Sequence, residues 1–129
     1  MSHVFDASAV LALVNSEKGA AKAASLIAGS SLSAVNAVEV QQKLIDVGMS
    51  AEDAEGLLDS LGLTIMPFDA RQASLASALR PFSRRHGLSL ADCACISLAL
   101  ALDRPALSGT QAWNNIAKEV GFRFDNVRQ

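Results

Sequence analysis

The sequence predicts a three-layer α/β/α sandwich built on a short, mostly parallel central sheet. Short strand-like runs alternate with longer helical segments along the whole chain, a pattern typical of a parallel sheet covered by helices. The 129 residues are enough for a real hydrophobic core, and half of them are apolar. No internal repeat, low-complexity tract or linker divides the chain, so we expect residues 1–129 to form a single α/β domain.

Five short runs are expected to form the strands of this sheet. In chain order they are residues 3–5, 31–33, 63–66, 104–107 and 122–124, the last of them at an edge. Asp6 follows the first run directly and therefore lies at the carboxyl end of its strand. In open parallel sheets, ligands bind in the crevice beyond these strand ends.

The segments between the runs carry helical spacing and capping signals. The expected helices are residues 7–14, 17–28, 34–46, 51–60, 70–85, 90–102 and 111–120. Asp6 or Ser8 is expected to cap the first helix and Ser33 or Asn36 the third, while Pro81 should bend or split the long one. The apolar positions expected on helix 34–46 are Val35, Val38, Leu44, Ile45 and Val47.

The segment 90–102 is apolar or small after its first turn, so most of this helix should be buried. Asp92 is the exception. It either stabilises the helix N-terminus, where the dipole favours an anion, or is a site carboxylate held by a rigid helix. Cys93 and Cys95 are two positions apart and point in different directions, so we expect both to be reduced core residues.

Composition excludes several classes of protein. The formal net charge is −2, which argues against a broad basic surface for non-specific nucleic-acid binding. Tyr is absent and aromatic residues are sparse, so a base-stacking platform is not expected. No long apolar run predicts a membrane span, and no secretion signal is evident, so we expect a cytoplasmic protein without a membrane partner.

One local basic cluster stands out against this charge balance. Arg80, Arg84, Arg85 and His86 come together just before the buried helix. Cations are favourable near a helix C-terminus, and this accounts for the cluster without any function. The same residues also form a possible patch for the phosphates of RNA or for an acidic segment of a partner protein. The sequence leaves both interpretations open.

Three acids are expected to share one edge of the sheet. Asp6, Glu39 and Asp92 each lie at a strand exit or in the first turns of a helix. A lone Glu on a helix is usually solvated, but Glu39 stands between two valines. Carboxylates that meet at one edge repel each other unless they are protonated or bridged by a cation. An oxygen-only set favours Mg²⁺ or Mn²⁺ over zinc.

At three places the sequence resembles the acidic motifs of PIN-domain nucleases, most of all VapC-type toxins of bacterial toxin–antitoxin pairs. The matching segments are Phe5-Asp6-Ala7-Ser8-Ala9, Ser33-Ala34-Val35-Asn36-Ala37-Val38-Glu39-Val40 and Leu88-Ser89-Leu90-Ala91-Asp92-Cys93. Their order and spacing, with a helix bearing Trp113 near the end, extend the resemblance over essentially the whole chain.

The resemblance implies a metal-dependent endoribonuclease with Asp6, Glu39 and Asp92 as catalytic residues. One or two Mg²⁺ or Mn²⁺ ions would bind these acids, Asp6 and Asp92 above all, and activate a water for in-line attack on an RNA phosphodiester. Such toxins form homodimers and are blocked by a small antitoxin, which typically inserts an Arg among the carboxylates. Their targets are structured RNAs.

One position departs from the family pattern. The family usually carries a fourth acid in a Thr-x-Asp sequence after the fourth strand, whereas this chain reads Ser108-Gly109-Thr110. We therefore assign Ser8, Ser108 and Thr110 supporting roles and expect weaker affinity for a divalent ion. The missing charge also favours a second hypothesis, in which a degenerate PIN domain binds a partner protein or RNA with little or no catalysis.

Overall fold

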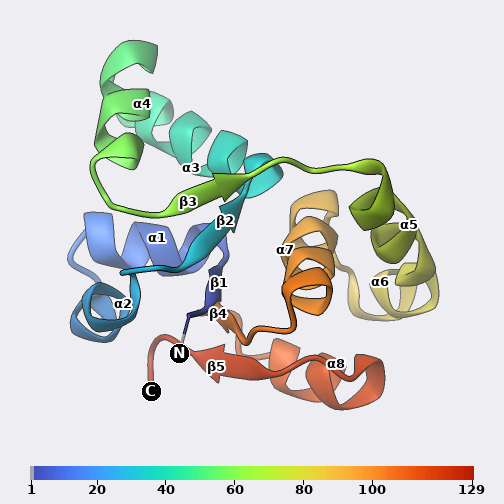
Figure 1. The fold of residues 1–129 in the computed structure, drawn as a ribbon. Coiled ribbons are helices and arrows are strands. Elements are labelled where there is room, and N and C mark those ends of the chain that lie inside the picture. Colours follow the sequence, from blue (N-terminus) through green and yellow to red (C-terminus); the bar gives the residue numbers. More distant parts are fainter. Residues whose placement is uncertain (1) are drawn as a thin grey trace.

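The computed structural model describes residues 2–129 and contains a sheet of five strands in the order β3-β2-β1-β4-β5 (Figure 1). The strands are Val4–Phe5 (β1), Ser31–Ser33 (β2), Thr64–Met66 (β3), Ala106–Ser108 (β4) and Phe124–Asn126 (β5). Every pair of neighbours is parallel, which confirms the predicted α/β fold with a parallel central sheet. The central strand β1 carries Asp6 at its carboxyl end.

Eight helices are assigned among these residues. They are Ala7–Val14 (α1), Ala20–Leu26 (α2), Ala34–Asp46 (α3), Ala51–Asp59 (α4), Ala70–Ala78 (α5), Arg80–His86 (α6), Leu90–Leu102 (α7) and Trp113–Val120 (α8). Within residues 2–129, no helix combines the length and the apolar character required to cross a membrane.

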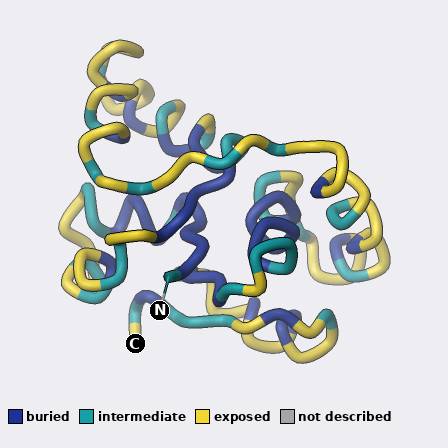
Figure 2. Tube along the Cα trace, viewed as in Figure 1, coloured by how far each residue is buried: buried dark blue, intermediate teal, exposed yellow. Residues whose placement is uncertain are grey.

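The helices form two layers, one on each face of the sheet. One buried cluster joins α1, α2, α3 and α4 to Phe5, Leu32 and Leu107, while a second joins α5, α7 and α8 to Val4 and Ala106. Adjacent residues of β1 thus enter opposite cores, as the alternation of side chains along a strand requires. Figure 2 shows the deepest burial in the inner strands and α7, with β3 more exposed at its edge.

The last two strands begin two residues later than expected. Pro105 precedes β4 because it has no N–H for the sheet, although its carbonyl accepts a hydrogen bond of 2.8 Å from the Val4 N–H. Phe122 lies outside β5, and its ring packs edge-on against Trp113, with 6.2 Å between ring centroids. Trp113 is fully buried, as predicted for a core anchor.

Three of the five apolar positions expected for helix 34–46 are exposed and do not pack in the core. Val38, Ile45 and Val47 are 53%, 42% and 81% exposed, although all three are strongly apolar. The buried positions are instead Asn36, Ala37, Val40 and Leu44. This inner face packs on α1 and α7, and the Asn36 side chain donates a hydrogen bond to the Ala91 carbonyl of α7. Ser33 caps the helix and Asn36 lies within it.

One other helix prediction needs correction, and another is confirmed. The expected helix 17–28 begins only at Ala20, because Gly19 has a left-handed backbone (φ +100°) and a Cβ there would lie 2.3 Å from the Val127 carbonyl oxygen. The expected split of helix 70–85 by Pro81 is confirmed: the segment is divided at Leu79 into α5 and α6, with Pro81 in the first turn of the second. Pro is tolerated there, so it splits this segment without unfolding either part.

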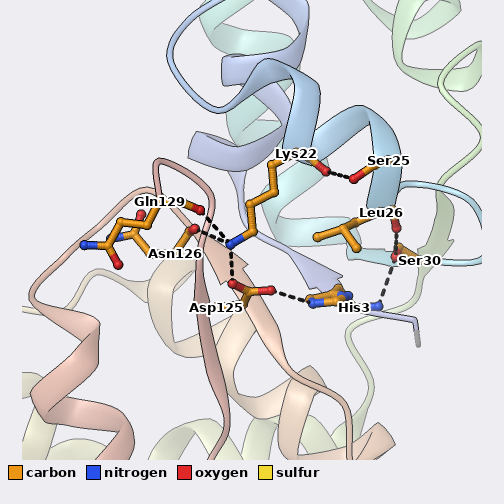
Figure 3. A network of polar contacts seen from close by, with 8 residues as sticks. All are labelled: His3, Lys22, Ser25, Leu26, Ser30, Asp125, Asn126 and Gln129. Carbon is orange, nitrogen blue, oxygen red and sulfur yellow. Dashed lines mark hydrogen bonds and ion pairs between the residues drawn. The ribbon is translucent and has the colours of Figure 1, made fainter.

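A polar network fastens the last strand to the start of the chain (Figure 3). The Asp125 carboxylate accepts hydrogen bonds from Lys22 Nζ at 2.6 Å and His3 Nε2 at 3.0 Å. Lys22 Nζ also donates to the carbonyl oxygens of Asn126 and Gln129. Residues from α2, the approach to β1 and the C-terminal segment are thereby held around one carboxylate.

Candidate metal and nuclease site

Asp6 is a buried carboxylate held by three hydrogen bonds at the carboxyl end of the central strand. It is 5% exposed and occupies the N-cap of α1. Its Oδ1 accepts from the Ser8 hydroxyl at 2.6 Å and the Ala9 N–H at 2.9 Å, and its Oδ2 accepts from the Ser108 hydroxyl at 2.6 Å. Asp6 therefore both caps the helix and presents an oriented carboxylate.

The loop after β4 supports this carboxylate from the other side. The Gly109 N–H donates to Ser8 Oγ at 2.8 Å, and the Thr110 N–H donates to Ser108 Oγ at 3.0 Å. Both serine hydroxyls are thus oriented by main-chain donors while they donate to Asp6. Thr110 itself is exposed and contributes its main chain to this arrangement. Thr110, an uncharged residue, therefore helps fix Ser108 through its main chain.

Burial raises the pKa of Asp6 above its ordinary value. Desolvation is the largest cause, and the hydrogen bonds from Ser108, Ser8 and Ala9 oppose it without cancelling it. The negative charge of Asp92 raises the pKa further. Ionised Asp6 is thus stabilised by dipoles but lacks a compensating positive charge, which is the condition in which a bound cation gains most.

Asp92 lies at the start of α7 in a reciprocal capping arrangement with Ser89. The Ser89 N–H donates to Asp92 Oδ2 at 2.9 Å, and the Asp92 N–H donates to Ser89 Oγ at 3.1 Å. One oxygen of this carboxylate therefore serves the helix, while Oδ1 has no hydrogen bond among the described residues. The structural and site interpretations of Asp92 are compatible, because they use different lone pairs.

Glu39 and Asp92 reach the neighbourhood of Asp6 from different helices. Asn36, one turn before Glu39, donates from Nδ2 to the Ala91 carbonyl at 3.1 Å and so joins α3 to the first turn of α7. Burial raises the pKa of the Cys95 thiol, and so do the charges of Asp6, Asp92 and Glu39, in that order. The negative charges of all three acids therefore act on the thiol that contacts the Phe5 carbonyl of β1.

The three acids are near one another but do not form a closed cluster. Within residues 2–129, no group of three or more His, Cys, Asp or Glu side chains is close enough to hold one metal ion. Glu39 is partly exposed on α3, and both cysteines are buried and free. Asp92 is the acid whose charge raises the pKa of Asp6, and the carboxylate oxygens of this pair suit a hard divalent ion whose remaining ligands are water.

The basic cluster divides in the structure. Arg85 and His86 both pair with Glu119 of α8, and Arg85 also lies over the Phe82 ring. Arg84 is exposed and forms no ion pair within the described chain, while Arg80 lines a cavity of about 350 Å³ between α5 and α7. Arg85 therefore has a structural contact, and Arg80 and Arg84 remain available to a partner.

Two residues near the site were missed by sequence reasoning. Asn36 is 1% exposed, and its Oδ1 has no hydrogen-bond partner. A polar residue one turn from Glu39, where a helix should be apolar, was a signal that could have identified it. Arg128 lies against Gly109, from a position 19 residues later in the chain, and no local pattern marks that contact.

Comparison with protein families shows which family this chain belongs to. The PIN domain model matches residues 3–119. The chain belongs to the PIN domain family. PIN domains are generally nucleases, and PIN nucleases generally use divalent metal ions. No curated protein sequence matches this chain significantly.

Solved structures with low sequence identity share the fold of this PIN domain. A chain of VapBC2 from Rickettsia felis, solved with a DNA fragment from its promoter, is 18% identical, with a TM-score of 0.74 and 98% of each chain covered. DNA-bound VapBC from Salmonella typhimurium gives 13%, 0.75 and 98% of each chain. FitAcB from Neisseria gonorrhoeae gives 17%, 0.71 and 96% of each chain. The PIN domain thus resembles the VapC toxins of VapBC systems.

Proposed function

We propose that this PIN domain is an Mg²⁺- or Mn²⁺-dependent endoribonuclease toxin that hydrolyses RNA phosphodiester bonds. The observation that carries the proposal is the state of Asp6, a buried and triply hydrogen-bonded carboxylate whose pKa is raised by burial and by Asp92. A carboxylate of this kind gains from a divalent ion, and the family is generally one of metal-using nucleases.

Asp6 and Asp92 would hold the ion, and Glu39 would act through water from α3. When bound, the ion would supply Lewis-acid activation of water and neutralise charge on the leaving oxygen. Ser8 and Ser108 hold the Asp6 carboxylate in one orientation, since both of its oxygens are engaged. Asn36 keeps Glu39 in register with Asp92 through the Ala91 carbonyl.

We further propose that a cognate antitoxin inhibits the site, that the chain forms a homodimer, and that it acts in the cytoplasm. VapBC and FitAcB, which share the fold, supply the precedent for a complex of this type. An arginine from the antitoxin would suit Asp6 and Asp92, because a guanidinium fork matches carboxylates in both charge and geometry. The remaining cations available to RNA or an antitoxin are Arg80, the first residue of α6, and Arg84, within that helix.

The alternative is a degenerate PIN domain that binds protein or RNA without cutting it. Two observations favour this alternative. Thr110 carries no charge at the family's fourth acidic position, and residues 2–129 contain no group of three acids at metal-binding distance. Binding of the ion together with a substrate phosphate would complete the site in an active enzyme, whereas a binding module needs no such completion.

RNA cleavage by isosteric variants distinguishes an endoribonuclease from a degenerate PIN domain. Asp6→Asn and Asp92→Asn preserve the acceptors that cap α1 and α7 but remove the charges, so the fold should persist. We expect Mn²⁺-dependent cleavage of RNA to fall below about one hundredth of the wild-type rate in each, at the upper end of what loss of a metal-site partner costs.

Asp59→Asn, an exposed change of the same charge on α4, is the matched control and should cleave like wild type. A wild-type protein that binds RNA or antitoxin but shows no metal-dependent cleavage would establish the degenerate domain. Cleavage that persists in Asp6→Asn would remove Asp6 from the catalytic set.

A further inference from the structure

The guanidinium of Arg128 lies against the loop that supports Asp6. A Cβ at Gly109 would be 2.7 Å from Arg128 Nε and 3.0 Å from Nη2, so the absence of a side chain at Gly109 makes room for the cation. The Gly109 N–H bonds to Ser8 Oγ, and Ser8 bonds to Asp6. The Arg128 guanidinium is thus linked to the Asp6 carboxylate through two intervening residues, Gly109 and Ser8.

This guanidinium is only weakly engaged within the chain. Nη1 donates to the Lys18 carbonyl at 3.3 Å, and Nη2 lies 3.9 Å from Glu17 Oε1, at the outer limit of an ion pair. The Arg128 side chain is 38% exposed. Because a guanidinium has five N–H donors, most of its capacity remains for a ligand. Asp6 is not its partner: the charge acting on Asp6 is that of Asp92.

Arg128 also lines a groove that leads away from the site. The groove encloses about 440 Å³ between α1 and α3, with Ser8 at the Asp6 end and Leu11 and Leu44 in its walls. Its cations are Arg128 and Lys43, and its acids are Glu17 and Asp46. Lys43 is four positions after Glu39 on α3, so both side chains lie on one face of that helix.

We propose that Arg128 is an RNA-binding residue that holds a backbone phosphate next to the scissile one. The inference rests on the proposed function, because it assumes that an RNA strand reaches Asp6. A strand cut at that carboxylate continues past the bond that breaks, and the groove from Ser8 to Arg128 gives it a path. A phosphate suits a guanidinium that is free of strong partners, since the two groups can form paired hydrogen bonds.

The salt dependence of RNA binding measures this contact without catalysis. The full-length chain is titrated with a short fluorescein-labelled oligouridylate in EDTA, which prevents metal-dependent cleavage. We expect Arg128→Ala to lower the slope of log affinity against log salt by about 0.7, the value for one phosphate contact on a single strand. Arg128→Lys should retain most of that slope, because it keeps a cation.

Gly109→Ala provides an independent variant that keeps the Arg128 side chain but moves its guanidinium. Gly109 does not have a left-handed backbone, so alanine fits its conformation, but the new methyl group displaces the flexible end of Arg128. We expect the same loss of slope as in Arg128→Ala. Arg71→Ala, an exposed change of equal charge on α5, is the control and should keep the wild-type slope.

The outcomes separate this inference from the proposed function. A wild-type chain that cleaves RNA, while Arg128→Ala and Gly109→Ala keep its salt slope and affinity, overturns the inference alone. A wild-type chain that neither binds nor cleaves RNA overturns both proposals. If Arg128→Ala retains RNA binding but loses binding to a polyglutamate peptide, Arg128 recognises an acidic protein segment and the RNA assignment is wrong.

Discussion

Asp6, at the carboxyl end of β1, and Asp125, in β5, are two carboxylates that the fold treats in opposite ways. Asp125 receives hydrogen bonds from Lys22 and His3, and these bonds and charges outweigh partial burial, so its pKa is lowered. Asp6 receives its side-chain hydrogen bonds from hydroxyls, and its pKa is raised because burial dominates and Asp92 adds a like charge. Of these two carboxylates, only Asp125 is paired with a cation.

Asp125 therefore stabilises the fold, whereas ionised Asp6 destabilises it. The Asp125 network joins four segments and gains stability from charges already present. Asp6 is oriented by donors that leave its charge uncompensated, an arrangement that costs stability unless a cation arrives. Uncompensated but well-oriented charge is what distinguishes a candidate functional site from an ion pair.

The largest expected effect is on the response to a divalent ion. We expect Mn²⁺ to raise the thermal stability of the wild type, by about 2.7 kcal/mol at a concentration one hundred times the dissociation constant. Asp6→Asn should abolish this gain, while Asp125→Asn should keep it because Lys22 already neutralises that carboxylate. Differential scanning calorimetry in EDTA and in Mn²⁺ makes the measurement.

An equal response in both variants would show that the ion binds elsewhere. It would also remove the functional distinction between the two carboxylates. Since Asn retains the capping acceptor at position 6, a lost response in Asp6→Asn would not be explained by an unfolded α1.

A smaller effect is expected from Ser108, which is fully buried and donates to Asp6 Oδ2 at 2.6 Å. Ser108→Ala removes that donor and leaves a buried carboxylate oxygen unsatisfied, at a cost of about 1–3 kcal/mol in the free energy of unfolding. RNA cleavage should fall about 10- to 100-fold, because a supporting partner of the site is lost. Urea unfolding and a cleavage assay measure the two effects.

Ser25→Ala is a suitable control for Ser108→Ala. Ser25 is exposed and donates only to the Lys22 carbonyl, at 2.7 Å, so both its stability and its cleavage should stay near wild type. If Ser108→Ala loses stability but cleaves at the wild-type rate, the orientation of Asp6 by Ser108 has no role in the reaction.

The sequence predicted the fold and the position of Asp6 more completely than the surroundings of Asp6. Strand–helix alternation and capping residues are local signals, and Asp6 and Ser33 cap α1 and α3, each being one of the two residues expected there. The exposure of Val38 and Val47 could not be predicted, because it depends on which face of α3 packs against α1 and α7.

The contacts that shape the site are long-range, which is why spacing alone could not reveal them. Ser108 meets Asp6 across 102 positions, and Asn36 reaches Ala91 across 55. The orientation of each side chain depends on strand order and helix packing, which a one-dimensional pattern does not encode. Asp125 shows the same limit, because its partners lie over a hundred residues away in sequence.

The smallest expected effect, about 1 kcal/mol, concerns how the two carboxylates respond to pH in metal-free protein. The pKa of Asp125 is lowered in the fold, so its contribution is favourable above its unfolded pKa and is lost as pH falls through the folded pKa. The destabilisation caused by Asp125→Asn should therefore be full at neutral pH, about 1 kcal/mol for hydrogen bonds on a one-third exposed carboxylate, and should shrink in acid.

The effect of Asp6→Asn on the free energy of unfolding should have the opposite sign to that of Asp125→Asn. Its pKa is raised in the fold, so the ionised carboxylate destabilises the native state above its folded pKa, and protonation relieves this as pH falls. Asp6→Asn should thus be more stable than wild type in EDTA at neutral pH, with the difference vanishing below the unfolded pKa. Free energies of unfolding measured from neutral pH into acid give both curves. Two curves of the same sign would mean that Asp6 is as well compensated as Asp125, and the case for a cation at this edge of the sheet would fall with that result.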